Sequence, residues 1–364
     1  MQQAATQTQA TAIAAPGAGW LYSRPFDLFL IFGTVLMGLA AGATWFMPHW
    51  IFNIVLLANL WLLGYQHVIA TFTRLCFDKA SFKRSWWLIF LLAPAVLGGV
   101  MLLAKFAGLW IIATIYLYAQ WFHYSRQSWG ISRAYERTAP HGYVADRSWQ
   151  TQAAFYSFPV LGILFRSWQH PATFLTMPVK FLPVSLGVVS ALGAVCAGLF
   201  IVWLVRVYSD WKKGVLPVAY TCFMFSHFFT FTVAYLVMPT IDSGWAILNV
   251  WHNMQYVMFV WMFNNRKFKD GVKTEARFLS YLSQKRNVVW YFGLSLLLTF
   301  IVYAGIKLTL VSTMATASVL TASVIVYMTI NFHHYIVDAI IWRMSWIRRE
   351  RASAPPAPAQ GAGA

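Results

Sequence analysis

Long, uninterrupted apolar runs dominate this 364-residue sequence and leave few architectures open to it. A bilayer's hydrocarbon core is about 30 Å thick, and an α-helix crosses it in about 20 residues. We find about ten runs of this kind, at residues 28–47, 50–73, 86–106, 108–128, 152–168, 184–207, 215–238, 244–264, 288–310 and 317–342. Because the runs are continuous rather than alternating, strands of a β-barrel are not expected. The sequence therefore predicts an all-α, polytopic transmembrane helix bundle.

Composition excludes several other classes of protein. Hydrophobic residues make up 59% of the chain and charged residues only 10%, against about 25% charged in average globular domains. Three widely spaced cysteines without a CxxC motif argue against a disulfide scaffold and a zinc ribbon. The net charge of +17 resembles a nucleic-acid signal, but the Lys and Arg residues lie between the apolar runs, where membrane topology explains them. We expect no nucleic-acid partner.

The positive charges also predict an orientation. With the N-terminus in the cytoplasm, all but four of the 27 Lys and Arg residues fall on the cytoplasmic side; the exceptions are Lys105, Arg166, Lys180 and Lys307. We therefore expect ten helices with both termini cytoplasmic, in a bacterial inner membrane. One transmembrane domain, residues 25–345, is expected between a disordered Ala/Gln/Thr-rich segment, 1–24, and a disordered basic and Pro/Ala-rich tail, 346–364.

Ionisable residues occur inside the predicted spans, where they are costly and usually functional. Asp338 is the one acidic residue within a span. Six of the nine histidines also fall within spans: His67, His123, His227, His252, His333 and His334.

Three of the predicted helices that carry these histidines share one pattern. An aromatic residue is followed after four residues by an Asn or Gln, after three more by a histidine, and after four more by a polar residue. Such steps keep all four side chains on one helix face. Lipid cannot satisfy a polar face, so each stripe should point into the bundle. The three sets are Tyr116, Gln120, His123 and Gln127; Trp245, Asn249, His252 and Tyr256; and Tyr327, Asn331, His334 and Asp338.

Neutral imidazoles and a carboxylate contributed by several helices suit iron, copper or zinc, and two facing imidazoles would also suit haem. We expect the metal ligands to come from His67, His123, His252, His333, His334 and Asp338, with His227 a weaker candidate. Ligating imidazoles usually donate their second N–H to a polar neighbour. The candidates for that role are Gln120, Gln127, Asn249, Tyr256 and Asn331. Interhelical hydrogen bonding alone is the alternative interpretation, above all for His227.

The histidines on separate helices, together with the His333–His334 pair, resemble histidine-coordinated membrane oxygenases. One comparison is the Brp/Blh-type carotenoid-cleaving dioxygenases, and another is the fatty acid hydroxylase and desaturase group. The HxxxH and HxxHH boxes of the desaturases do not occur in this sequence. The resemblance therefore implies a small non-haem iron site rather than a desaturase-type di-iron site.

Three functions follow as expectations. The first is an iron-dependent oxygenase or hydroxylase that takes a lipid or isoprenoid substrate from the bilayer and draws on an electron donor. The second is a haem-binding electron-transfer protein. The third is a transporter or proton channel, in which the histidines and Asp338 form a relay.

The distribution of positive charge can be tested directly. We expect reporter fusions in the loops at 74–85, 130–150 and 266–286 to report a cytoplasmic location, because these segments hold much of the Lys and Arg. A periplasmic signal from any one of the three would mean that a span has been miscounted.

Overall fold

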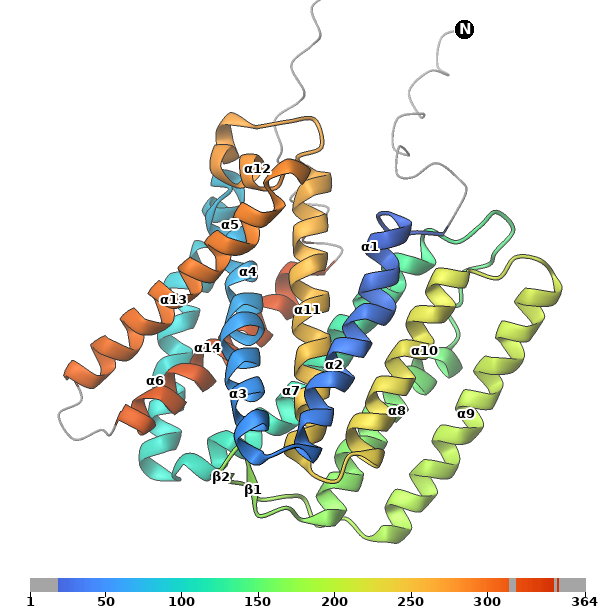
Figure 1. Cartoon of the computed structure of the whole chain (residues 1–364), viewed down its shortest axis with the longest axis horizontal. Helices are drawn as coiled ribbons and strands as arrows, with labels where there is room; N and C mark the ends of the chain where they lie inside the picture. The colour runs from blue at the N-terminus through green and yellow to red at the C-terminus, as the bar shows by residue number, and fades with distance from the viewer. Residues whose placement is uncertain (1–18, 314–318, 344–345, 347–364) are drawn as a thin grey trace, which may run out of the picture.

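The computed structural model describes residues 19–313, 319–343 and 346, and these residues are almost entirely helical (Figure 1). The helices that build the bundle are α1 (Arg24–Leu28), α2 (Thr34–Ala43), α3 (His49–Asn59), α4 (Tyr65–Cys76), α5 (Lys79–Phe90), α6 (Leu92–Phe106), α7 (Leu109–Glu136), α8 (Trp149–Gln169), α9 (Leu186–Lys212), α10 (Val218–Thr232), α11 (Ile241–Lys267), α13 (Val288–Thr313) and α14 (Val319–Ile341). The short α12 (Arg277–Leu282) lies between α11 and α13. The expected all-helical class is confirmed.

Several labelled helices are parts of longer helices. π-helical turns join α1 to α2 at η1 (Phe29–Gly33) and α3 to α4 at η3 (Leu60–Gly64), and a third, η4 (Val233–Val237), extends α10. Such turns insert one residue into a helix and occur often at functional sites. The sequence pattern did not reveal them.

Six helical segments within the described residues are long and apolar enough to cross a membrane. They are Arg24–Phe46, His49–Cys76, Lys79–Phe106, Leu186–Lys212, Val218–Val237 and Lys285–Gly305. The helices α7, α8 and α11 have 28, 21 and 27 residues but are less apolar, since they carry many of the polar side chains that the bundle buries. The six apolar segments indicate an integral membrane protein.

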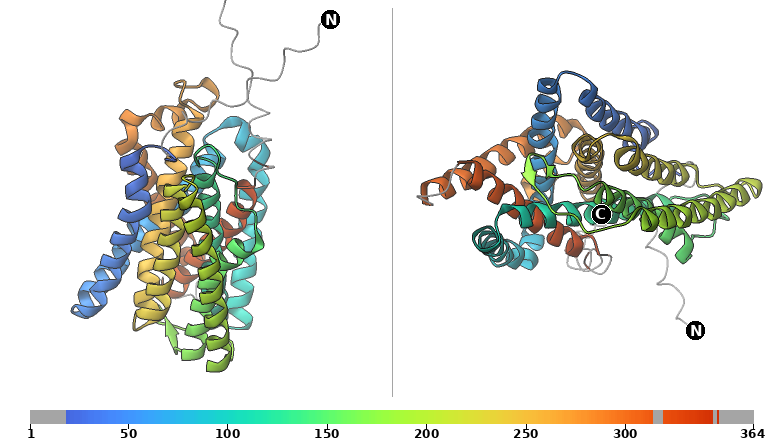
Figure 2. Two further views of the ribbon diagram at one scale, coloured as in Figure 1. Left: turned by 90° about the vertical axis from the view of Figure 1, so that its right-hand side faces the viewer. Right: turned by 90° about the horizontal axis from the view of Figure 1, so that it is seen from below.

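Burial separates interior helices from peripheral ones. Most residues of α11 are buried, whereas α9 buries only Val189, Cys196 and Trp203 and α6 only Val100. Seen from below, α9 and α13 lie at opposite ends of an elongated bundle, with α7 and α11 between them (Figure 2). The polar helices thus occupy the centre, and the most apolar ones face outward.

The two ends of the bundle are closed by short connections. At one end, the antiparallel strands β1 (Thr173–Phe174) and β2 (Met177–Pro178) form a hairpin whose two turn residues have positive φ. At the other end, the Asp27 carboxylate accepts hydrogen bonds from the backbone N–H groups of residues 21–23. Residues 19–23 therefore have a defined place, although we expected disorder throughout 1–24. Residues 1–18 and 347–364, the rest of the two expected disordered segments, lie outside the described residues.

Two glycines allow α2 to pack closely against α11. Gly38 and Gly42 lie one turn apart and face Ile247 of α11. A Cβ at Gly38 would lie 2.7 Å from the carbonyl oxygen of Ile247, and one at Gly42 would collide with the Ile247 side chain. Small residues spaced in this way let transmembrane helices approach each other. This contact positions α11 only five residues before His252.

We expect Gly38→Ala to destabilise the protein by about 1–3 kcal/mol, because the added methyl group meets a backbone oxygen that can move only with the helix. The matched control is Gly98→Ala on α6, where a Cβ would meet nothing within 4 Å. Thermal unfolding in detergent measures both variants. Equal melting temperatures for the two would contradict this account of the α2–α11 contact.

Candidate metal centre

Four helices each bring one histidine to the centre of the bundle. They are His67 on α4, His123 on α7, His252 on α11 and His334 on α14, and all four are buried. The ring centroid of His67 lies 5.3 Å from that of His252 and 4.6 Å from that of His334. The ring centroid of His123 lies 5.0 Å from that of His252 and 4.9 Å from that of His334. The structure thus brings together four histidines that are far apart in sequence.

Possible metal-ligand atoms of this four-histidine cluster form two overlapping groups of three residues, which share His123. Ligand atoms of His67, His123 and His252 lie within 4.8 Å of one another, and so do those of His123, His334 and Asp338. Within the described part of the chain, the Nε2 atoms of all four histidines are buried without a hydrogen-bond partner. One buried imidazole nitrogen without a hydrogen-bond partner would not indicate a metal site, but four of them in one cluster are a set of possible metal ligands.

The local backbone fixes the tautomer of His67. Its Nδ1 lies within hydrogen-bond distance of the carbonyl oxygen of Gly64, the last residue of the π-helical turn η3. A carbonyl only accepts, so Nδ1 carries the proton. In the neutral ring, Nε2 then holds a lone pair, as a metal ligand requires.

A polar network also fixes the tautomer of His334. Its Nδ1 lies 3.0 Å from Oγ1 of Thr71, which donates to Oδ1 of Asp338 at 3.2 Å. The Tyr256 hydroxyl donates to the same oxygen at 2.7 Å. Because the Thr71 hydroxyl donates its proton to the Asp338 carboxylate, the Thr71 oxygen accepts a hydrogen bond from the Nδ1–H group of His334. The lone pair of the His334 ring is then on Nε2. Oδ2 of Asp338 lies 3.7 Å from that Nε2, which is too far for a hydrogen bond.

Tyrosine rings pack against the other two histidines of the cluster, His123 and His252. Tyr335 stacks on His123 with ring centroids 4.3 Å apart, and Tyr124 lies 3.9 Å from His252. The Tyr124 hydroxyl accepts hydrogen bonds from the amides of Gln120 and Asn249, each at 2.7 Å. These two amides were expected to bond the histidines, and they instead fix a tyrosine that packs against one.

The remaining polar candidates have different partners. Tyr256 bonds Asp338, as described above. Gln127 donates to the backbone carbonyl of His252 at 3.3 Å, and Asn331 donates to the Tyr327 carbonyl of its own helix at 2.8 Å. Gln127 therefore ties α7 to α11 beside the cluster, while the described contact of Asn331 is internal to α14.

Two histidines among the expected ligands lie outside the cluster. His227 has both ring nitrogens in hydrogen bonds of 3.0 Å, to Ser128 and to the Phe155 carbonyl. His333 places Nε2 2.6 Å from the Leu88 carbonyl on α5 and stacks on Phe72. Neighbouring residues differ by about 100° around a helix, so His333 and His334 face different neighbours. Both His227 and His333 fit interhelical hydrogen bonding.

Sequence reasoning did not identify Thr71 or Tyr124 as parts of the site. A signal existed for Thr71, because it follows His67 by four residues, as Gln127, Tyr256 and Asp338 follow their histidines. Tyr124 directly follows His123, and no spacing rule distinguishes it from the other 16 tyrosines.

Thr71 offers a test of the network around His334. We expect Thr71→Val to weaken the binding of Fe²⁺ or Zn²⁺ about 10–100-fold, the usual cost of losing a group that orients a ligand. Thr71→Ser keeps the hydroxyl and should bind within a few-fold of the original protein. Metal titration of purified protein measures both affinities, and equal weakening in both variants would point to packing rather than to the hydroxyl.

Comparison with known protein families, with curated proteins and with solved structures found no match for this chain. The functional argument therefore depends on the side chains and their geometry.

Proposed function

We propose that the four-histidine cluster binds one first-row transition-metal ion, preferentially iron, and that the protein is a membrane oxygenase or hydroxylase acting on a lipid or isoprenoid. The observation that supports this proposal is a cluster of four buried histidines whose Nε2 atoms lack a hydrogen-bond partner, with ligand atoms of His67, His123 and His252 within 4.8 Å of one another.

Energetics favours a metal over packing alone. Leaving one buried donor or acceptor without a partner costs about 1–3 kcal/mol. Four such atoms in one place would consume a large share of the 5–15 kcal/mol by which a typical domain is stable. His227 and His333 show that this bundle satisfies ring nitrogens where they serve packing. A bound ion would satisfy all four Nε2 atoms at once.

The donor set narrows the identity of the ion. Imidazole suits iron, copper, zinc and nickel, and metal–nitrogen distances of about 2.0–2.1 Å require donor atoms about 3–4 Å apart. The ligand atoms of His67, His123 and His252 lie within 4.8 Å of one another, so side-chain shifts would bring them to that spacing. A haem macrocycle fits less well, because the four rings lie edge to face with centroids 4.6 to 5.3 Å apart.

We further propose that the long but less apolar helices α7, α8 and α11 also cross the membrane, as does α14, which is apolar over Ile325–Ile341. Together with the six apolar segments they give ten spans, with both termini in the cytoplasm of a bacterial inner membrane. The positive charge of the loops and the inward polar faces of these helices support that arrangement.

A hydrophobic substrate could approach this cluster from the bilayer. Phe122, next to His123, is 48% exposed, and Ile336, next to Tyr335, is 41% exposed. Both side chains lie on the outer surface of helices whose inner faces carry the cluster. An acyl or isoprenoid chain in the bilayer would therefore meet the outer faces of α7 and α14, the two helices that contact each other through His123 and Tyr335.

Each part of the chain has a distinct task in this proposal. Iron, when bound, would supply the activation of O₂. The four histidines hold the ion, while Gly64 and Thr71 keep two of the rings in the tautomer that presents Nε2. Asp338 supplies negative charge, and Tyr124 and Tyr335, which pack against His252 and His123, exclude water from the rings.

A proton relay is the second candidate, and the continuous chain from Tyr256 through Asp338 and Thr71 to His334 favours it. Metal analysis separates the two candidates. The oxygenase should purify with about one iron per chain and show no haem absorption, in line with one shared set of four ligands. Oxygen consumption should then depend on iron and on an added isoprenoid or fatty acid. Protein that binds no transition metal would refute the oxygenase and leave the relay.

Single substitutions test the ligand set. We expect His252→Ala and His334→Ala each to lose the bound metal while the protein stays inserted and helical, because an average hydrogen bond between membrane helices is worth only about 0.6 kcal/mol. His333→Ala is the matched control, since it removes the neighbouring imidazole outside the cluster. Metal content per chain decides the outcome. If all three variants retain metal equally, the ion does not bind at these histidines.

A further inference from the structure

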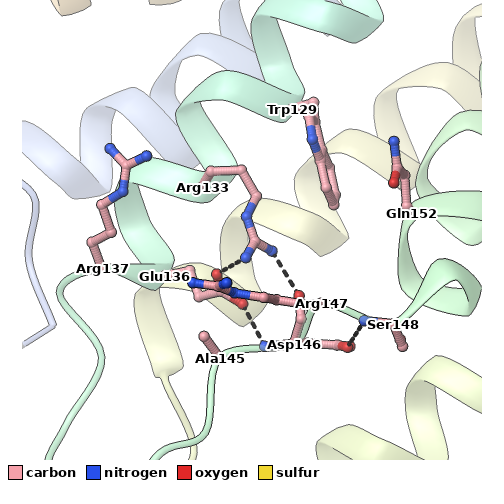
Figure 3. Close-up of a pocket in the computed structure, with 9 residues that line it drawn as sticks. All are labelled: Trp129, Arg133, Glu136, Arg137, Ala145, Asp146, Arg147, Ser148 and Gln152. Carbon is pink, nitrogen blue, oxygen red and sulfur yellow. Dashed lines mark hydrogen bonds and ion pairs between the residues drawn. The ribbon is translucent and has the colours of Figure 1, made fainter. Parts of the chain in front are cut away.

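A second polar site lies at the end of the bundle that also holds α12 and the start of α1. A cavity of about 420 Å³ opens between the end of α7, the loop at 145–148 and the start of α8 (Figure 3). Three arginines, two carboxylates, a tryptophan and a glutamine are among the residues that line it: Arg133, Arg137, Arg147, Glu136, Asp146, Trp129 and Gln152. The four-histidine cluster contributes no residue to this lining.

The two carboxylates are already engaged inside the protein. Glu136 forms an ion pair with Arg133 and accepts from the backbone N–H of Asp146 at 2.8 Å. Asp146 lies 3.0 Å from Arg206 and accepts from Ser148 and Thr151. Burial alone would raise the pKa of Asp146, but these hydrogen bonds and Arg206 lower it below its usual value. Both carboxylates are buried, and their charge is offset by Arg133 and Arg206.

The accessible part of the cavity is therefore positive. Arg137 and Arg147 are exposed, as is Gln152 on the first turns of α8. Figure 3 shows Arg133, Arg137 and Arg147 around the same opening, with Trp129 on its upper side and Gln152 across from it. Planar guanidinium groups bind phosphate oxygens with two parallel hydrogen bonds, and an amide adds a further donor.

Two exposed apolar residues flank the lining segment 145–148 in the sequence. Val144 is 77% exposed and Trp149 is 69% exposed. Exposed tryptophan next to arginine is typical of the headgroup level of a membrane. We infer that this cavity binds a phosphate group, carried either by an anionic phospholipid headgroup or by a soluble phosphate.

Binding to the full-length protein in a neutral detergent tests this site. The probes are short-chain phosphatidylglycerol, short-chain phosphatidylcholine and inorganic phosphate, and isothermal titration measures each Kd. The variant Arg137→Gln/Arg147→Gln removes both exposed cations. The control, Lys212→Gln/Lys213→Gln, removes the same charge from the exposed end of α9.

We expect the double arginine variant to bind phosphatidylglycerol at least about tenfold more weakly, since each charge-assisted hydrogen bond is worth more than a neutral one. The lysine control should stay within about twofold, because its charges lie outside the cavity. Gln152→Glu, which adds a negative charge to the lining, should also weaken binding. Inorganic phosphate that binds with the same arginine dependence would assign the site to soluble phosphate, and a lipid-only response would assign it to the headgroup.

Three results would overturn the inference. One is that neither phosphatidylglycerol nor inorganic phosphate binds. Another is equal weakening in the arginine and lysine variants, which would mean attraction by net charge alone. The third is that neither the affinity for phosphatidylglycerol nor the affinity for inorganic phosphate differs among the variants. Circular dichroism and melting temperature confirm that each variant is folded.

Discussion

Hydrocarbon cannot hydrogen-bond to a polar side chain, and this constraint determines how the bundle is assembled. The helices α4, α7, α11 and α14 each carry a polar stripe, and the stripes meet where protein rather than lipid surrounds them. The apolar helices α6 and α9 bury few residues and remain at the periphery. Close packing at Gly38 and Gly42 then sets the position of α11, the most buried of the central helices.

Histidine has two different roles within this one interior. His227 and His333 bond to carbonyl or hydroxyl groups of neighbouring helices and so contribute to packing. In the cluster, Gly64 and Thr71 bond to Nδ1 of His67 and His334, and the Nε2 atoms of all four histidines lack a hydrogen-bond partner. The two roles differ in whether Nε2 has a hydrogen-bond partner. This criterion distinguishes a structural imidazole from a candidate metal ligand more clearly than burial does.

The long continuous apolar runs predicted the helical class, and the spacing of polar residues predicted the inward-facing stripes, because steps of three and four residues place side chains on one helix face. It also singled out His123, His252 and His334, which the structure brings together with His67. It could not separate His333 from His334, since that depends on which neighbour each ring meets. The π-helical turn that directs the Gly64 carbonyl to His67, and the contact of Tyr124 with His252, arise from packing that no local pattern encodes.

In the proposed metal centre, imidazoles from four helices share one ion. X-ray absorption at the metal edge of the purified, metal-loaded protein measures the coordination shell directly. The account predicts nitrogen neighbours at about 2.0–2.1 Å, with the outer-shell scattering that imidazole rings produce. A shell of sulfur or of oxygen alone, without imidazole scattering, would contradict it.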